Sequence, residues 1–301
     1  MLLAVVRHAP GGDTEVVCDR ATITRIGRGV DRTGELAPEG IARTLDVLRA
    51  YREEARRLGA ERLAAVGTSA LRDARNGHAF LEPAAAILGS PVEVITGERE
   101  AQLTFVGATH GLGLEQVDVT VVDVGGGSTE LVRGRGHRAR EAISIDIGSV
   151  RAFERHVHDD PPTEAQLAAA AREAERTLRA ANVRPEPPLI GIAGTVTTLS
   201  SMLQELPRYE PDRIHGSRIA RAPLDTLIER MVSRTTEQRA RMPGLDPGRA
   251  DVIATGAILV RTIMVLANTD ELIVSTGGVR MGLADELLRS RHPRPTPAGA
   301  S

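Results

Sequence analysis

The stretch VVDVGGGSTE, residues 121–130, puts three consecutive glycines directly after an apolar strand and between two carboxylates, Asp123 and Glu130. Glycine loses more backbone entropy on folding than any other residue, so an ordinary turn rarely contains three in a row. We therefore expect that some group approaches this backbone so closely that no Cβ atom can be accommodated. The rest of the chain indicates what kind of group this is.

Two further apolar strands end in glycine turns. The segment PPLIGIAGT leads into Gly194, and ELIVSTGG ends in Gly277–Gly278; both turns run into predicted helices. In open α/β sheets, ligands bind at the carboxyl ends of the strands, where helix N-termini and free amides attract anions. Unrelated tight turns would explain any one of these glycines, but the three turns together favour a phosphorylated ligand.

Composition limits the class of protein. At 301 residues the chain is long enough for two domains, and its 41% hydrophobic and 26% charged residues are ordinary for a globular protein. Aromatic residues make up only 2%, with no Trp, so a stacking platform for single-stranded nucleic acid is not expected. The formal charge of −2 gives no overall attraction to DNA or to anionic lipid. We therefore expect neither nucleic-acid nor membrane partners.

The absence of lysine and the presence of a single cysteine restrict the chemistry that the protein can perform. All 38 basic residues are Arg, which excludes a Walker lysine and a Schiff-base lysine, so anion binding falls to Arg and to backbone amides. The single cysteine, Cys18, excludes an intramolecular disulfide and a Cys-based zinc site. With no secretory signal and no apolar run approaching the ~20 residues of a membrane span, the sequence predicts a cytoplasmic protein.

Strands and helices alternate along the chain in two blocks. The first block contains predicted strands at 1–6, 14–26, 63–69 and 91–97 and a predicted helix at 38–58. The second contains a strong helix that begins at a capping-box pattern of Thr163 and Gln166. We predict an N-terminal domain at 1–116, a C-terminal domain at 117–288 and a disordered tail at 289–301.

Several segments, in chain order, together resemble the exopolyphosphatase and guanosine pentaphosphate phosphohydrolase family. They are GTSALRDARNG, ITGEREAQLTFVG, VVDVGGGSTELV, GIAGTVTTL, RADVIATGAIL and STGGVRMGL, and the resemblance extends over about residues 1–288. That family belongs to the actin-like, sugar-kinase and Hsp70 ATPase superfamily. The resemblance therefore implies an α/β fold of two actin-like, ribonuclease-H-like domains with a cleft between them near residue 116.

The resemblance also implies a reaction. We expect a Mg²⁺-dependent phosphohydrolase of the stringent response, which releases terminal phosphate from inorganic polyphosphate, from guanosine pentaphosphate, or from both. Such a reaction needs an in-line water and neutralisation of charge on the transferred phosphoryl group. Two alternatives stay open: a kinase or ATPase of the same superfamily, and a non-catalytic phosphate or alarmone sensor. A homodimer is also an open alternative.

Roles for single residues follow from the same resemblance. Glu100, in ITGEREAQL, matches the family position that orients the attacking water as general base; the alternative is a solvated glutamate in a first helical turn. Arg72, in TSALRDARN, resembles a phosphate-contacting arginine, with a surface salt bridge as the alternative. Asp123 and Glu130 are expected to hold Mg²⁺. The other phosphate-binding positions are Gly125, Gly126, Gly127, Ser128, Gly194 and Thr195.

Family members usually begin with a strand and a loop of the type Asp-x-Gly-(Ser/Thr)-Asn-Ser, followed by a strand that MLLAVV at 1–6 resembles. We therefore expect residues 1–301 to lack that first strand and its phosphate loop. On this expectation, the chain as given hydrolyses polyphosphate poorly and is less soluble than a form that includes the segment.

Two other groups of polar residues are less specific. HVHDD at 156–160 is expected to be a solvated loop rather than a metal site. The arginines near the predicted hairpin turn are either surface charges or a track for a long polyanion; they are Arg133, Arg135, Arg138 and Arg140.

Overall fold

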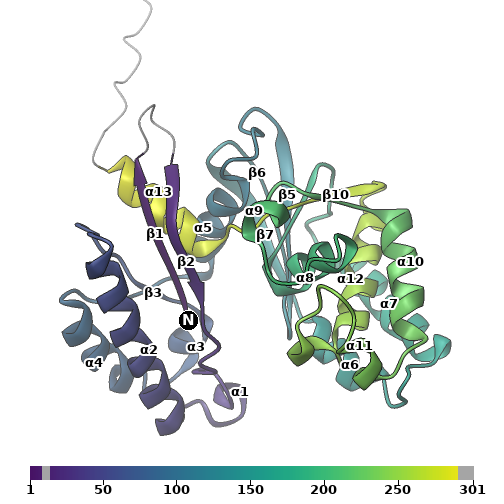
Figure 1. The fold of residues 1–301 in the computed structure, drawn as a ribbon, viewed down its shortest axis with the longest axis horizontal. Helices are drawn as coiled ribbons and strands as arrows, with labels where there is room; N and C mark the ends of the chain where they lie inside the picture. The colour runs from purple at the N-terminus through teal and green to yellow at the C-terminus, as the bar shows by residue number, and fades with distance from the viewer. Residues whose placement is uncertain (9–13, 291–301) are drawn as a thin grey trace, which may run out of the picture. The chain divides into compact units, whose positions relative to one another are not determined.

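The protein, described here by a computed structural model over residues 1–8 and 14–290, separates into two compact units (Figure 1). Unit 1 comprises Met1–Leu103 together with the C-terminal helix α13 (Val279–Arg289), and unit 2 comprises Thr104–Gly278. Each unit is mixed α/β, as predicted. No helix among the described residues is long and apolar enough to cross a membrane.

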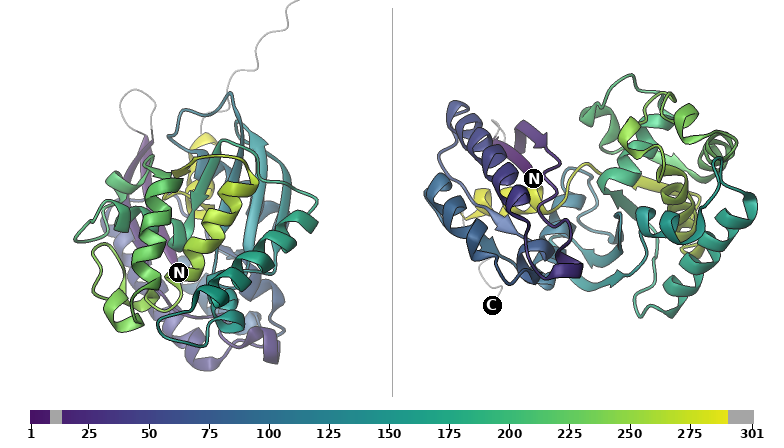
Figure 2. Two further views of the ribbon diagram at one scale, coloured as in Figure 1. Left: turned by 90° about the vertical axis from the view of Figure 1, so that its right-hand side faces the viewer. Right: turned by 90° about the horizontal axis from the view of Figure 1, so that it is seen from below.

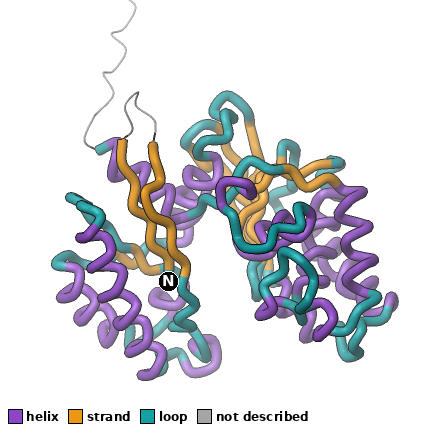
Figure 3. The backbone as a smooth tube through the Cα atoms, viewed as in Figure 1, coloured by secondary structure: helices purple, strands orange, loops and turns teal. Residues whose placement is uncertain are grey.

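Unit 1 contains two separate pairs of strands. Strand β1 (Leu2–His8) pairs antiparallel with β2 (Thr14–Ala21), and β3 (Val66–Gly67) pairs parallel with β4 (Glu93–Val94). Figure 3 shows the long β1–β2 hairpin and the much shorter β3 and β4. The helices are α1 (Val30–Thr33), α2 (Pro38–Arg57), α3 (Ser69–Asp73), α4 (His78–Leu88), the first part of α5 (Gly97–Thr109), and α13.

The core of unit 1 lies mainly between α2 and α4. Leu45 and Leu48 of α2 pack with Phe80 and Ala84 of α4, and all four are buried. Helix α2 spans Pro38–Arg57 against a prediction of 38–58, because proline occupies its first position and its leucines recur at helical spacing.

Unit 2 is built on one six-stranded sheet with the order β7-β6-β5-β8-β10-β9. Strands β5, β8 and β10 run parallel, whereas β6, β7 and β9 are antiparallel additions. The strands are β5 (Asp118–Val124), β6 (Thr129–Arg135), β7 (Arg138–Ile145), β8 (Leu189–Ile192), β9 (Arg218–Ala220) and β10 (Glu271–Val274).

Helices bury the apolar residues of this sheet. They are α6 (Ser149–His156), α7 (Glu164–Ala180), α8 (Ala193–Leu203), α9 (Pro211–Ile214), α10 (Arg221–Val232), α11 (Thr236–Arg239) and α12 (Ile253–Leu266), with a short 3₁₀ turn at Pro247–Arg249. Helices α7, α12 and α10 lie side by side (Figure 2), and α12 also contacts α6 and α8. The predicted capping box of Thr163 and Gln166 at the start of α7 is confirmed.

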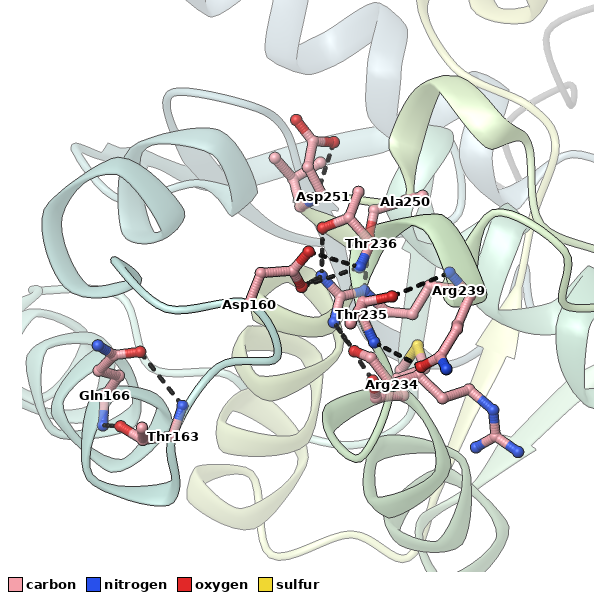
Figure 4. A network of polar contacts seen from close by, with 12 residues as sticks. Asp160, Thr163, Gln166, Arg234, Thr235, Thr236, Arg239, Ala250 and Asp251 are labelled. Carbon is pink, nitrogen blue, oxygen red and sulfur yellow. Dashed lines mark hydrogen bonds and ion pairs between the residues drawn. The ribbon is translucent and has the colours of Figure 1, made fainter.

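A buried arginine fastens α11 to its surroundings (Figure 4). Arg239 is 1% exposed and donates to three carbonyl oxygens, of Ala250, Arg234 and Met231, at 2.7, 2.6 and 3.4 Å. The Asp160 carboxylate accepts from the Thr236 amide at 2.8 and 2.9 Å and lies 3.5 Å from the Arg239 guanidinium. The charge is therefore buried with its donors occupied.

The two units do not coincide with the predicted ranges of 1–116 and 117–288. They differ at both places where the chain passes from one unit to the other. Helix α5 begins in unit 1 and ends in unit 2, where Phe105 lies so close to β6 that a Cβ at Gly134 would be 2.8 Å from its ring. Helix α13 returns to unit 1, where Arg280 makes a bidentate ion pair with Asp19 at 2.8 and 2.6 Å. Arg289 still belongs to α13, and residues 291–301 of the predicted tail lie outside the described residues.

Candidate active site

The glycine turns of unit 2 lie next to one another because their strands are neighbours. Strand β5 pairs parallel with β8, with Asp123 opposite Ile192, so the turns after both strands meet at one edge of the sheet. The Thr195 hydroxyl donates to the Val124 carbonyl at 2.7 Å and joins the two turns directly. The parallel strands and their shared edge are those expected of an α/β ligand site.

In the turn after β5, the backbone carbonyls of Gly125 and Gly126 are hydrogen-bonded to α6, whereas most of the backbone amides are not bonded to protein groups that the structure describes. The Gly125 carbonyl accepts from the Ser149 amide at 2.9 Å, and the Gly126 carbonyl accepts from the Val150 and Arg151 amides at 2.9 and 3.0 Å. These bonds cap the N-terminus of α6. The Gly125 amide bonds the Ser128 carbonyl at 3.0 Å. Within the described residues, the amides of Gly126, Gly127 and Ser128 have no such partner, and both glycines are exposed.

Neighbouring atoms limit the space at two of the three glycines. A Cβ at Gly125 would lie 3.1 Å from the Ser128 carbonyl of the same turn, and one at Gly126 would lie 3.3 Å from Val150 of α6. One at Gly127 would lie 3.4 Å from the Arg151 guanidinium, an ordinary contact distance. Packing inside the unit therefore favours glycine at two of these positions, and the close approach of a ligand stays a prediction.

Asp123 and Glu130 are directly opposite each other across β5 and β6. Residues in such register share a face of the sheet with Cβ atoms about 4.5–5.5 Å apart, and like charges placed so repel. Both residues are half-buried, and Ser144 donates to Glu130 at 2.7 Å. The expected juxtaposition of the two carboxylates is therefore present at the mouth of the glycine turn.

This carboxylate pair fits Mg²⁺ better than a metal held entirely by protein. The described residues contain no group of three or more His, Cys, Asp or Glu side chains that could hold a metal ion. Mg²⁺ is typically bound by one or two carboxylates, with water and substrate phosphates completing its coordination. Asp123 and Glu130 can provide that number of ligands.

The turn after β8 contains a backbone conformation that propensity does not favour. Ala193 has φ of 63°, in the left-handed region that non-glycine residues seldom adopt and that recurs at functional sites. Beside it, the Arg249 guanidinium lies so close to Gly194 that a Cβ there would be 2.3 Å from Nη2. Thr195 is 3% exposed and its hydroxyl is bonded to Val124, so only its backbone is suited to meeting a ligand.

Two arginines near the turns were missed by the sequence analysis. Arg249 covers Gly194, and Arg151 lies beside Gly127 while forming an ion pair with Asp146. Arg249 is the first residue of RADVIATGAIL, a segment that contributed to the family resemblance without a role for its arginine, and Arg151 follows SIDIGSV without a local motif. Their proximity to the glycines arises from tertiary packing.

In unit 1, the predicted base and the predicted phosphate ligand contact each other. Arg72 Nη1 lies 3.3 Å from Glu100 Oε2, and the two side chains are 35% and 31% exposed. Arg72 Nη1 also donates to the Ile95 carbonyl at 2.9 Å. The alternative of a salt bridge for Arg72 is therefore realised, with Glu100 as its partner. The neighbouring Arg99 pairs with Glu286 of α13 at 2.8 Å.

The third glycine turn and the hairpin arginines have structural explanations. A Cβ at Gly277 would lie 2.0 Å from the Gly107 carbonyl, so this glycine permits contact with α5. Arg133 pairs with Glu141 and Glu186, while Arg135 and Arg140 pair with Asp118. The small pocket that Arg133 and Arg140 border is lined by the same three acids. Matched charges favour the surface-charge interpretation over a polyanion track.

The polar segment at 156–160 is only partly the solvated loop that was expected. His158, Asp159 and Asp160 are exposed and lie outside the helices. His156 is instead the last residue of α6, and it and Arg155 pair with Glu173 of α7. Burial opposes ionisation of Glu173, but its bonds to His156 and Arg155 prevail and lower its pKa. Asn76, in the same TSALRDARN segment as Arg72, fixes its loop: it accepts from the Leu36 amide at 2.8 Å and donates to the Leu36 carbonyl at 3.0 Å.

The chain is similar to proteins of a known family. A sequence profile of the Ppx/GppA phosphatase family matches residues 4–291. Exopolyphosphatase 2 of Mycobacterium tuberculosis is 41% identical over 286 residues, covering 91% of this chain and 89% of that protein. Guanosine-5'-triphosphate,3'-diphosphate pyrophosphatase of Vibrio vulnificus is 30% identical over 290 residues, covering 95% of this chain but only 56% of that protein.

Solved structures agree with this similarity. The crystal structure of the Aquifex aeolicus member of the Ppx/GppA family has a TM-score of 0.86 at 32% identity, covering 97% of this chain and 95% of that chain. An exopolyphosphatase from Cytophaga hutchinsonii has a TM-score of 0.81 at 26% identity, covering 96% of this chain and 94% of that chain. The expected actin-like α/β fold is confirmed by these similarities.

Proposed function

The chain belongs to the Ppx/GppA phosphatase family, and from this premise we propose that it is a phosphohydrolase releasing the terminal phosphate of inorganic polyphosphate, of guanosine pentaphosphate, or of both. The exopolyphosphatase and pyrophosphatase names of its relatives support both substrates. Each substrate ends in a phosphoanhydride, so the same residues serve either.

The observation that carries the proposal is the set of amides in the turn after β5. The carbonyls of Gly125 and Gly126 are directed to α6, while the amides of Gly126, Gly127 and Ser128 are left to bind an anion. Successive amides of this kind form a nest that suits phosphate oxygens. Because the sequence has no lysine, fixed positive charge near the turn comes from arginine, and Arg249 is suitably placed beside Gly194.

For the chemical step, we assign the general base to Glu100. A phosphate oxyanion competes with Glu100 for Arg72, so substrate binding releases the carboxylate to accept a proton from the attacking water. The water oxygen bonds to phosphorus as the bridging P–O bond breaks, and the leaving phosphate takes the negative charge. Arg72 thus has two partners, one after the other: Glu100 before the substrate binds, and the phosphoryl group once the substrate is bound.

Asp123 and Glu130 are the residues that would hold Mg²⁺. When bound, the ion neutralises negative charge on the phosphoryl oxygens and on the leaving phosphate. The two carboxylates are opposite each other across β5 and β6, a placement that is unfavourable for like charges, and a bound cation would offset this. Ser144, which donates to Glu130, fixes the orientation of that carboxylate.

A phosphate-release assay tests the proposal. The purified 301-residue protein is incubated with Mg²⁺ and either polyphosphate or guanosine pentaphosphate. The same assay is run on a form of the protein that is extended by any in-frame upstream codons. We expect release of orthophosphate from at least one substrate. Binding of both substrates without release in either form would instead support a sensor. Transfer from ATP to a sugar acceptor, with ADP as product, would support a kinase.

A further inference from the structure

Arg151, in the first turn of α6, is fixed beside the glycine turn of unit 2 at two points. Its amide donates to the Gly126 carbonyl at 3.0 Å, and its guanidinium lies 3.4 Å from the position that a Cβ of Gly127 would occupy. The side chain is only 31% exposed, so packing holds most of its length in place. The guanidinium therefore stays at the edge of the turn whose amides we assign to phosphate, and it reaches that turn by side-chain rotation alone.

The carboxylate that holds Arg151 is itself exposed to solvent. Asp146 follows β7 directly, forms an ion pair with Arg151 and has a side chain that is 73% exposed. Ion pairs this exposed contribute little, because water competes for both partners. A phosphate group offers several charged oxygens to the planar fork of a guanidinium. Phosphate can therefore displace Asp146 from Arg151.

Asp146 keeps a cation after this exchange. Arg155, one turn further along α6, lies 3.6 Å from the second carboxylate oxygen of Asp146. Arg155 is in turn held by Glu173 of α7 at 2.7 Å. When Arg151 leaves Asp146, the carboxylate is thus still paired with Arg155. The arrangement lets Arg151 change partners without leaving a charge unpaired.

We propose that Arg151 is a substrate-binding residue, which pairs with Asp146 in the free protein and turns to the phosphate held by the amides of Gly126, Gly127 and Ser128 when the substrate binds. The proposal rests on the proposed function for the identity of the ligand. It gives the turn a full positive charge, which a nest of neutral amides lacks.

A purely structural role for Arg151 predicts a different result. If Arg151 only fastens the end of β7 to α6 through Asp146, removal of either partner breaks the same contact, and both substitutions act alike. If Asp146 and phosphate compete for Arg151, the two substitutions have opposite effects on phosphate affinity. The sign of the effect at Asp146 therefore separates the two roles.

The test measures binding of imidodiphosphate, a diphosphate whose bridging nitrogen resists hydrolysis, to the full chain by isothermal titration calorimetry with Mg²⁺. We expect Arg151→Gln to raise Kd by roughly 10- to 100-fold, as for loss of a hydrogen bond to a charged group. Asp146→Asn should lower Kd by about 2- to 5-fold, because it frees Arg151 from an exposed pair. Arg172→Gln, at an exposed position of α7, removes the same charge and should leave Kd nearly unchanged.

The double variant Arg151→Gln/Asp146→Asn separates exchange of partners from simple repulsion. Removal of the negative charge of Asp146 would help any anion to bind, whether or not Arg151 takes part. Under the proposal Asp146 acts through Arg151, so the double variant should bind imidodiphosphate as weakly as Arg151→Gln alone. If Asp146→Asn lowers Kd by the same factor in both backgrounds, the exchange is overturned.

Arg151→Lys covers the case in which Arg151→Gln lowers the midpoint of thermal unfolding. It keeps the charge and the apolar stem but loses the planar fork, so we expect a smaller rise in Kd, of about 3- to 10-fold. Unchanged affinity in both Arg151 variants would overturn the assignment of Arg151 while the proposed function stands. Absence of imidodiphosphate binding to the unsubstituted protein would instead overturn the amide nest, and the proposed function with it.

Discussion

Glu100 and Arg72 form an ion pair at 3.3 Å, and substitution of Glu100 tests the proposed reaction most directly. Glu100→Gln keeps the shape of the side chain and removes the proton acceptor. We expect kcat for phosphate release to fall by about 10²–10⁴-fold, with a much smaller change in KM. Steady-state kinetics with polyphosphate measures both.

Glu98→Gln is the matched control, because Glu98 is an exposed residue in the same first turn of α5. It should leave both kinetic constants nearly unchanged. If Glu100→Gln turns over at the normal rate, another group orients the water and the assignment of the base is wrong.

The carboxylate pair gives a second prediction at this scale. Asp123→Asn removes one charge of the Asp123–Glu130 pair, so the Mg²⁺ concentration for half-maximal activity should rise by roughly 10–100-fold, the range seen when metal sites lose a supporting group. Asp118→Asn is the control, because Asp118 lies on the same strand but pairs with Arg140. A magnesium titration that is identical for both variants would exclude Asp123 as a ligand.

The residues of the candidate site were predictable to different degrees. Asp123, Glu130 and the glycines lie within one contiguous stretch, and a hairpin of that length places the two carboxylates opposite each other. Arg249 reaches Gly194 from a segment more than fifty residues later, so no local pattern indicated it. Thr195 was expected to bind phosphate, yet its hydroxyl is bonded to Val124, a detail that depends on tertiary packing.

At the scale of elements, α11 depends on its buried arginine. Arg239→Leu would leave the carbonyls of Ala250 and Arg234 without donors, and the half-exposed Asp160 without its nearest cation. We expect a loss of about 3–5 kcal/mol in the free energy of unfolding. Urea unfolding followed by circular dichroism measures it.

Arg241→Leu is the control for that experiment. Arg241 lies two residues further on, is 75% exposed and, within the described part of the chain, forms an ion pair only with the exposed Glu237. Its replacement should change the free energy of unfolding by no more than about 0.5 kcal/mol. Similar losses for both variants would show that the network around Arg239 contributes little.

His215 couples the end of α9 to β10 in a pH-dependent way. Its Nδ1 accepts from the Thr276 amide at 3.3 Å. Burial lowers the pKa of His215 and outweighs a hydrogen bond with the His110 backbone and the charge of Asp212, both of which raise it. Because the folded-state pKa lies below the unfolded value of about 6.5, the unfolded state binds more protons as the solution is acidified. The stabilising contribution is therefore complete above that pH and is lost as the pH falls through the folded-state pKa.

Thermal unfolding of the unsubstituted protein should show this loss on acidification below about pH 6.5. His215→Asn keeps an acceptor for the Thr276 amide without titrating, so the slope in that window should become flatter. His78→Asn, at an exposed position of α4, should leave it unchanged. An unaltered slope in His215→Asn would assign the acid sensitivity to other groups.

The elements themselves were predicted well where the signal was local. Helix α7 begins at the predicted capping box, and α2 ends within one residue of its predicted end. The strand expected at 63–69 is reduced to Val66–Gly67, because a strand is defined by its partners and, among the residues that the structure describes, β3 pairs with β4 alone. Hydrophobic pattern indicates where a strand can form, but not how much of it finds a neighbour.

For the whole molecule, the division into units was the least predictable feature. A boundary at 116 follows from reading the chain as two successive blocks. Arg280 instead pairs with Asp19, 261 residues earlier in the sequence, and Arg62 donates to the Leu287 carbonyl at 2.5 Å. Contacts over such separations leave no periodicity or motif in either segment, so α13 could not be assigned to unit 1 from the sequence.

The return of α13 to unit 1 has a consequence for the order of events during synthesis. Unit 2 is one continuous stretch, Thr104–Gly278, and can fold as soon as it has left the ribosome. The amino-terminal part of unit 1 emerges first but has to wait for α13, which is translated after unit 2. Domains usually fold in the order in which they are made. Here unit 2 is expected to finish first, and the nascent segment Met1–Leu103 stays exposed to chaperones until α13 has left the ribosome.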